Sequence, residues 1–87
     1  MISEPYITKL NKCREEINEI DNQLVQLLEQ RMSLVKGIGQ IKQHFNEPIY
    51  VPEVEEKKIK TLSEKTSYRG MIEVIWPVIM CYSRTLE

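Results

Sequence analysis

Residues 10–45 read LNKCREEINEIDNQLVQLLEQRMSLVKGIGQIKQHF, and this stretch decides the fold class. Its apolar side chains recur every three or four residues, which is the period of one face of an α-helix. The residues on this face are Leu10, Cys13, Ile17, Ile20, Leu24, Leu27, Leu34, Ile38, Ile41 and Phe45. We therefore predict a long amphipathic helix from about residue 5 to about residue 45.

Sequence signals at both ends support these bounds. Ser3 with Pro5 suits a helix start, because proline is tolerated in a first turn, and residues 46–48 (Asn-Glu-Pro) suit a helix end. Gly37 and Gly39 lower the local helix propensity, but they leave the apolar period intact and permit close packing of a second helix.

This helix is too long for its own chain to cover. At about 1.5 Å per residue it extends roughly 60 Å, about twice the dimension expected of a compact chain of 87 residues. A chain of this size also buries only a modest core by itself. We therefore expect residues 1–87 to form a single domain that pairs with a second copy as a homodimer.

Two shorter helices are predicted after the long one. Pro52 fits the first position of a helix whose first turn is acidic and which ends near Glu64. Thr66 or Ser67 is placed to cap a last helix that continues to the C-terminal residues, with a kink at Pro77. The chain is thus predicted to be all-α, with one long, one short and one medium helix.

Composition argues against several classes of function. A formal net charge of −1 with 29% charged residues lacks the basic footprint of a nucleic-acid binder. The sequence has neither a targeting segment at its start nor an apolar run of membrane-spanning length, so we expect a cytoplasmic protein with no membrane partner. Cys13 and Cys81 match neither a metal site nor a disulfide framework, and we expect reduced thiols packed among apolar side chains.

Arg31 is the first candidate for chemistry, because it interrupts the apolar face of the long helix. A guanidinium there costs desolvation free energy unless it is paired or binds an anionic ligand, and a buried salt bridge explains it equally well. Lys42 lies eleven residues later, about 1100° of helix rotation, and shares a face with Arg31 to within about 20°. The two cations are placed to grip one ligand, although an isolated helix lysine is more often solvated.

Arg14 lies seventeen residues before Arg31, about 25 Å along the helix axis, and cannot reach the same small ligand from the same helix. An antiparallel partner helix would bring it there. The simpler interpretation is a surface arginine that pairs with a nearby acid such as Glu15 or Glu19.

Glu55, Ser83 and Glu87 carry weaker signals. Glu55 is one of several acids in a helix first turn. Ser83 and Glu87 lie four residues apart on one face of the final helix, where the sequence by itself predicts an exposed terminal turn. The single histidine, His44, is not arranged with a serine or cysteine as a nucleophile and base, and the sequence has neither a glycine-rich phosphate loop nor a metal-ligand pattern. Any chemistry must therefore rely on cationic and hydrogen-bonding groups.

The runs LNKCREEINEIDNQLVQLLEQRMSLVKGIGQIKQ, PIYVPEVEE and IMCYSRTLE together resemble the all-helical chorismate mutases, and they cover nearly the whole chain. The most specific part of the resemblance is the spacing of Arg14, Arg31 and Lys42. It implies an intertwined helical homodimer with two shared active sites. It also implies rearrangement of chorismate to prephenate for the biosynthesis of phenylalanine and tyrosine, without metal or cofactor.

The resemblance assigns a role to each matching position. Arg31 and Arg14 of the partner subunit match the pair that binds the substrate carboxylates. Lys42 matches the donor to the substrate's ether oxygen. Glu55 matches the acid that holds the ring hydroxyl, and Ser83 matches a hydroxyl near a substrate carboxylate.

Three further positions need comment. Glu87 stands where the family carries a glutamine, or in some members a glutamate, at the ether oxygen, and it must be protonated to donate there. Val54 stands where the family usually has an arginine. Val51, which we include in the predicted substrate site, stands where some members have an aspartate. The loss of a cation at Val54 is expected to weaken the binding of a dianion.

Two other functions stay open at the level of sequence. An isochorismate pyruvate lyase has a similar fold and similar cationic residues, and its substrate differs only in the placement of a hydroxyl group. A non-catalytic helical dimerisation or effector-binding module is favoured by Val54 and by the charged C-terminus.

Overall fold

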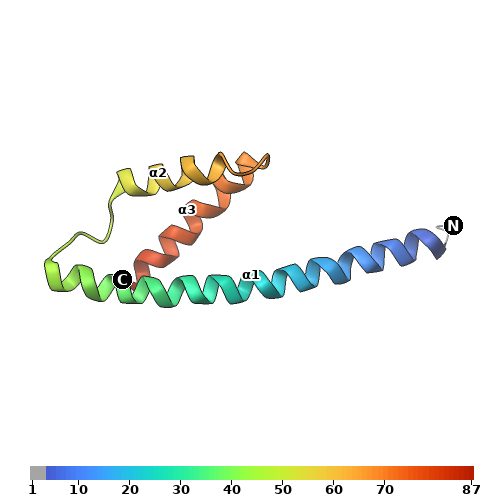
Figure 1. Ribbon diagram of the computed structural model, residues 1–87, viewed down its shortest axis with the longest axis horizontal. Coiled ribbons are helices and arrows are strands. Elements are labelled where there is room, and N and C mark those ends of the chain that lie inside the picture. The colour runs from blue at the N-terminus through green and yellow to red at the C-terminus, as the bar shows by residue number, and fades with distance from the viewer. Residues whose placement is uncertain (1–3) are drawn as a thin grey trace. The chain divides into compact units, whose positions relative to one another are not determined.

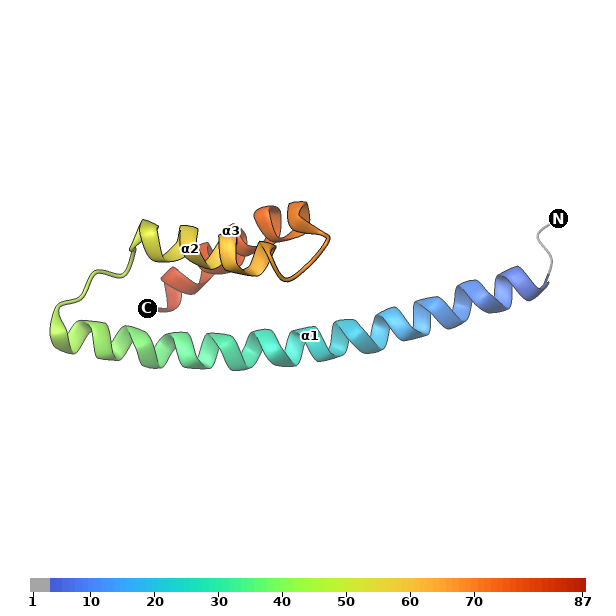
Figure 2. The same cartoon turned by 45° about the horizontal axis from the view of Figure 1, so that its top comes forward.

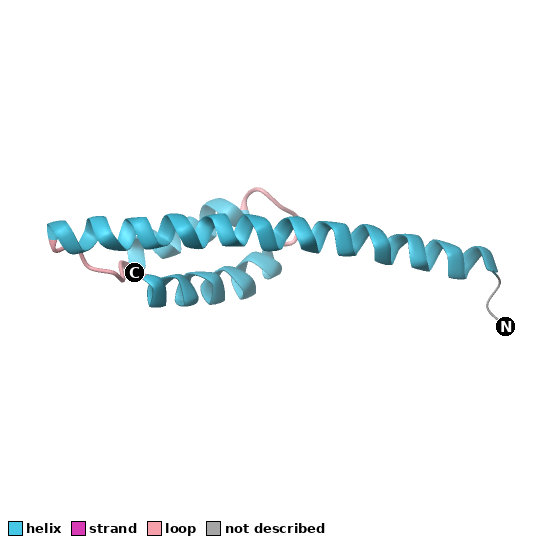
Figure 3. Cartoon of the chain, turned by 90° about the horizontal axis from the view of Figure 1, so that it is seen from below, coloured by secondary structure: helices cyan, strands magenta, loops and turns pink. Residues whose placement is uncertain are grey.

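The computed structural model describes residues 4–87 and contains three α-helices, with no β-strand in that range (Figure 3). They are α1 (Glu4–Phe45), α2 (Pro52–Ser63) and α3 (Arg69–Leu86). The all-α prediction and the bounds of the first two helices are confirmed. Ser3, which was expected to help open the first helix, lies outside the described residues.

The chain divides into two units, Met1–Arg31 and Met32–Glu87, with the boundary inside α1. In the first unit α1 presents an apolar face that this unit leaves uncovered. The face includes Leu10, Ile17, Ile20, Leu24 and Leu27, which are between 47% and 58% exposed. None of the three described helices combines the length and the apolar character needed to cross a membrane.

The second unit contains the last turns of α1, together with α2 and α3. The chain turns back after α2, so that α3 packs against α2 and returns toward the C-terminal part of α1 (Figures 1 and 2). Among the described residues the buried apolar side chains are Val35, Ile72 and Met80. Each such side chain stabilises the fold by about 1.5–3 kcal/mol. Three of them make a small core.

The end of α1 is formed by a Schellman motif. Asn46 adopts φ 56°, in the left-handed region that asparagine tolerates better than most residues. The Glu47 N–H donates to the Lys42 carbonyl at 2.8 Å, and the Asn46 N–H donates to the Gln43 carbonyl at 3.4 Å. These bonds satisfy carbonyl groups that a helix end leaves open. The predicted stop at residues 46–48 is thereby confirmed.

The predicted cap of the third helix is wrong. The N-cap residue is Tyr68, which makes no side-chain cap bond, rather than Thr66 or Ser67. The Thr66 hydroxyl instead accepts a hydrogen bond from the Tyr68 N–H at 3.0 Å. A threonine that binds the backbone two residues later forms a turn, so the helix begins only after it. The helix continues without interruption through Pro77.

The two cysteines also differ from expectation. Cys13 and Cys81 are free thiols, but both are exposed rather than packed among apolar side chains. The helix surfaces that carry them are not covered by this chain, because its core is small. The two cysteines would become buried only if another chain packed against these helix surfaces.

Candidate active site

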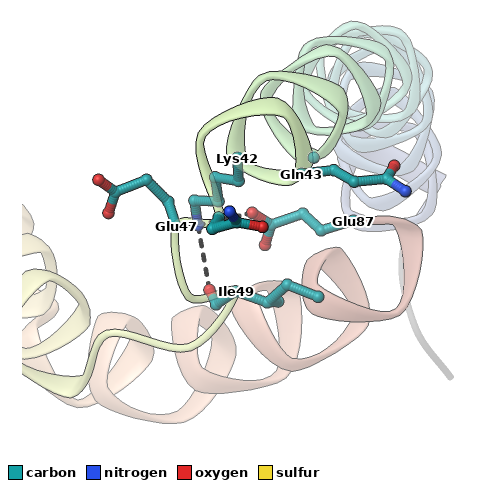
Figure 4. A pocket seen from close by; sticks show the side chains of 7 residues that line it. Lys42, Gln43, Glu47, Ile49 and Glu87 are labelled. Atoms are coloured by element: carbon teal, nitrogen blue, oxygen red, sulfur yellow. Dashed lines mark hydrogen bonds and ion pairs between the residues drawn. The ribbon is translucent and has the colours of Figure 1, made fainter.

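Lys42 and Glu87 form the centre of the candidate site. Lys42 lies on the last turn of α1, and Glu87 follows the end of α3. The lysine Nζ lies 2.7 Å from Glu87 Oε1, and the two side chains are 25% and 8% exposed. The lysine ammonium also donates a hydrogen bond to the Ile49 carbonyl at 3.1 Å (Figure 4). The structure thus brings together the two residues that were predicted to be catalytic.

The carboxylate of Glu87 is in ionic contact but lacks a hydrogen bond at one oxygen. Lys42 Nζ lies 2.7 Å from Oε1 as an ion pair, and Oε1 is buried with no hydrogen bond from the described residues. Buried polar oxygens are almost always hydrogen-bonded in folded proteins. Glu87 therefore keeps a buried hydrogen-bond acceptor at the site.

Gly39 makes the close approach of Glu87 possible. A Cβ atom on Gly39 would lie 2.6 Å from the Glu87 Cα and 2.8 Å from its carbonyl oxygen. Such distances are far below van der Waals contact, so a side chain at this position would displace the end of α3. The expectation that this glycine permits close helix packing is confirmed. Gly37 has open space where its Cβ would be.

A pocket of about 510 Å³ opens beside the Lys42–Glu87 pair (Figure 4). Its volume lies in the range of small-molecule sites. The lining combines the last turn of α1 with the segment that follows it and with the end of α3. The lining residues are Gly39, Lys42, Gln43, Asn46, Glu47, Ile49 and Glu87.

Glu55 does not lie free in the first turn of α2, because it is paired with Arg84 of α3. Arg84 Nη1 donates to both carboxylate oxygens of Glu55, at 2.6 Å and 2.5 Å. The guanidinium also lies 4.4 Å from the centre of the Tyr50 ring, a cation–π distance. The hydrogen bond to Glu55 raises the pKa of Arg84 above its ordinary value. Sequence reasoning missed Arg84, although an arginine after the largely apolar stretch of residues 74–82 was a signal for it.

Ser83 is buried where α3 meets α1. Its hydroxyl donates to the Ile79 carbonyl at 2.7 Å and lies 3.5 Å from the Met32 sulfur. A serine that binds the carbonyl four residues earlier satisfies its hydroxyl within the helix. The prediction of an exposed terminal turn is therefore wrong for Ser83, which is 5% exposed.

The remaining predicted residues belong to other segments of the chain. Arg14 is exposed and Arg31 is half-buried, and both belong to the part of α1 in the first unit. Val51 is the N-cap residue of α2, and its carbonyl accepts hydrogen bonds from the Val54 and Glu55 N–H groups. Within residues 4–87 no group of three histidine, cysteine, aspartate or glutamate side chains is placed to hold a metal ion.

The family model of chorismate mutase type II matches residues 13–87. This chain belongs to that family. The chorismate mutase of Methanocaldococcus jannaschii is 42% identical over 85 residues, which are 93% of this chain and 86% of that protein. No solved structure matches the chain.

Two longer relatives share part of their sequence with this chorismate mutase domain. The T-protein of Enterobacter agglomerans is 31% identical over 85 residues, which are 93% of this chain and 23% of that protein. The bifunctional chorismate mutase/prephenate dehydratase of Aquifex aeolicus is 45% identical over 49 residues, 56% of this chain and 14% of that protein. The chain thus spans less than a quarter of the length of these two relatives.

Proposed function

We propose that this chain is a chorismate mutase, an isomerase that rearranges chorismate to prephenate in the biosynthesis of phenylalanine and tyrosine. The observation that supports this most is the Lys42–Glu87 pair beside a pocket of small-molecule size. In the reaction one C–O bond breaks while one C–C bond forms, by a cyclic shift of electrons within the substrate. The reaction therefore needs no nucleophile, no redox partner and no net proton transfer.

The site suits a reaction in which negative charge grows on the ether oxygen. A lysine ammonium has three N–H donors. One N–H donor of Lys42 is hydrogen-bonded to the Ile49 carbonyl, and the ammonium also contacts Glu87. These two contacts fix the position of the ammonium. Donors that are fixed before the reaction stabilise the transition state without reorganisation. We assign Lys42 as the donor to the ether oxygen, with protonated Glu87 as the second donor.

The substrate is a dianion, and we propose that two chains supply the cations that bind its carboxylates. Arg31 would come from one chain, and Arg14 of the partner subunit would complete the site. The exposed apolar face of α1 and the small core support a homodimer, because both leave surface for a second chain to cover. Residues 1–87 would then form one chorismate mutase domain whose active sites are shared.

Three further residues complete the proposed site. Glu55 would hold the ring hydroxyl, and its carboxyl group is already oriented by Arg84. Ser83 would lie near a substrate carboxylate, and Val51 would contribute an apolar contact where an acid is absent. We further propose a cytoplasmic location, which the exposed free thiols of the chain favour, because a reducing compartment keeps such thiols unpaired.

The direct test is turnover of purified protein with chorismate and, separately, with isochorismate. A chorismate mutase converts chorismate to prephenate. This conversion is monitored as a decrease in the absorbance of chorismate. Salicylate from isochorismate would instead identify an isochorismate pyruvate lyase. Binding of chorismate without turnover at any pH between about 4 and about 8 would identify a non-catalytic effector-binding module.

A further inference from the structure

Arg84 is one of two cations of the second unit that are partly shielded from solvent. Residues 32–87, all of them described, contain Lys36, Lys42, Lys57, Lys58, Lys60, Lys65, Arg69 and Arg84. Only Lys42 and Arg84 of this set are half-buried, whereas the others are exposed. A half-buried cation has lost part of its hydration and binds an anion more strongly than an exposed one does. The second unit therefore has two places where an anion would be held well.

Arg84 is bound on one side only. A guanidinium has five N–H donors in a rigid fork, on Nη1, Nη2 and Nε. Both contacts with Glu55 are made by Nη1, and no residue in the described part of the chain accepts a hydrogen bond from Nη2 or Nε. The Tyr50 ring lies at 4.4 Å from the guanidinium and steadies it without using a donor. Arg84 is thus held in position with three donors left for a ligand.

The location of Arg84 links the two halves of the site. It lies three residues before Glu87 on α3, and its carbonyl accepts the Glu87 N–H at 3.3 Å. The same guanidinium contacts Glu55 of α2. Arg84 is thus paired with one carboxylate of the proposed site and is joined through its backbone to the residue that carries the other. The neighbouring position on α2, Val54, brings no charge and is 62% exposed.

We propose that Arg84 is a substrate-binding residue that holds an anionic oxygen of the ligand through Nη2 and Nε, while Nη1 keeps Glu55 in place. The inference rests on the proposed function, in which the ligand is a dicarboxylate. Arg84 supplies positive charge next to Glu55, where Val54 supplies none. Its loss therefore weakens ground-state binding of the substrate more than it slows the chemical step.

The test is a double-mutant cycle with Arg84→Gln, Glu55→Gln and the combined variant. We measure kcat and KM for chorismate, and the Kd of prephenate, which keeps two carboxylates, by titration calorimetry. Arg84→Gln is expected to raise KM and Kd about tenfold or more and to change kcat less than about threefold. When Arg84→Gln is added to Glu55→Gln, it is again expected to raise KM and Kd about tenfold, because Arg84 contacts the ligand itself. Arg84→Lys keeps the positive charge but loses the planar fork of donors, so its KM and Kd are expected to lie between those of wild type and Arg84→Gln.

Arg69→Gln is the matched control, because it removes an exposed arginine from the same helix and is expected to leave KM within about twofold. The proposal is overturned if Arg84→Gln leaves KM and Kd within about twofold. It is equally overturned if the effect vanishes in the Glu55→Gln background, since Arg84 would then act only by orienting Glu55. If Arg84→Gln unfolds because Glu55 is left unpaired, the comparison of Glu55→Gln with the double variant decides the question. Absence of wild-type turnover would instead refute the proposed function, and the Kd values for prephenate would still decide the role of Arg84.

Discussion

Among single residues, Glu87 leads to the most specific prediction, which concerns the pH dependence of kcat/KM. Its proposed role requires a proton on its carboxyl group. The carboxyl donates to the ether oxygen only when protonated, so kcat/KM should be highest in acid and should fall about tenfold per pH unit once the proton is lost. Glutamine donates at every pH, so Glu87→Gln should flatten the profile and keep activity near neutrality. We would measure kcat/KM from about pH 4 to about pH 9 at constant ionic strength. A flat wild-type profile, or the same alkaline fall in the variant, would remove Glu87 from the mechanism.

Gly39 carries the second prediction at this scale, since its backbone touches that of Glu87. In Gly39→Ala the new Cβ would meet the Glu87 Cα at 2.6 Å, which shifts the carboxyl group and should lower kcat/KM about tenfold or more. Gly37→Ala is the control, because its Cβ meets nothing within 4 Å and should stabilise α1 by about 0.5–1 kcal/mol. Kinetics and thermal unfolding of both variants check this. Equal activity of the two would contradict the close approach.

At the scale of elements, the end of α1 decides where the following segment starts, and this end depends on the conformation of Asn46. A β-branched residue is strained at φ 56°, so Asn46→Val should lower the free energy of unfolding by about 1–2 kcal/mol. Asn46→Gly should be as stable as wild type or more so, because glycine adopts this conformation without strain. Urea unfolding compares the three proteins. Equal stability of the valine variant would show that the Schellman motif does not hold the helix end.

At the scale of the whole molecule, the proposed shared site predicts complementation between inactive variants. Arg14→Ala and Arg31→Ala should each lose nearly all activity as homodimers. Co-refolding equal amounts of the two should restore about one quarter of wild-type activity, because half of the dimers are mixed and each mixed dimer has one intact site of two. The activity of the mixture is measured against each variant alone. If both arginines came from the same chain, no site would be intact and the mixture would stay inactive.

A folded helical monomer in sedimentation at micromolar concentration would rule out the homodimer.

The sequence by itself determined the helices and where most of them begin and end. The spacing of Ile17, Leu24 and their neighbours, with Pro52 as a start signal, acts within a few residues of the chain, so it is readable without a fold. The family was also within reach, because the matched runs cover nearly the whole chain, and the resemblance assigned Lys42 and Glu87 to one site.

Only the tertiary structure decided which side chains meet between helices. The Arg84–Glu55 pair depends on the register of α3 against α2, which the packing of these two helices sets. The start of α3 at Tyr68 was decided by a threonine hydroxyl that bound a backbone N–H in the turn instead of capping the helix. In such cases one polar group has several possible hydrogen-bond partners. Which bond forms depends on neighbours that are distant in the sequence.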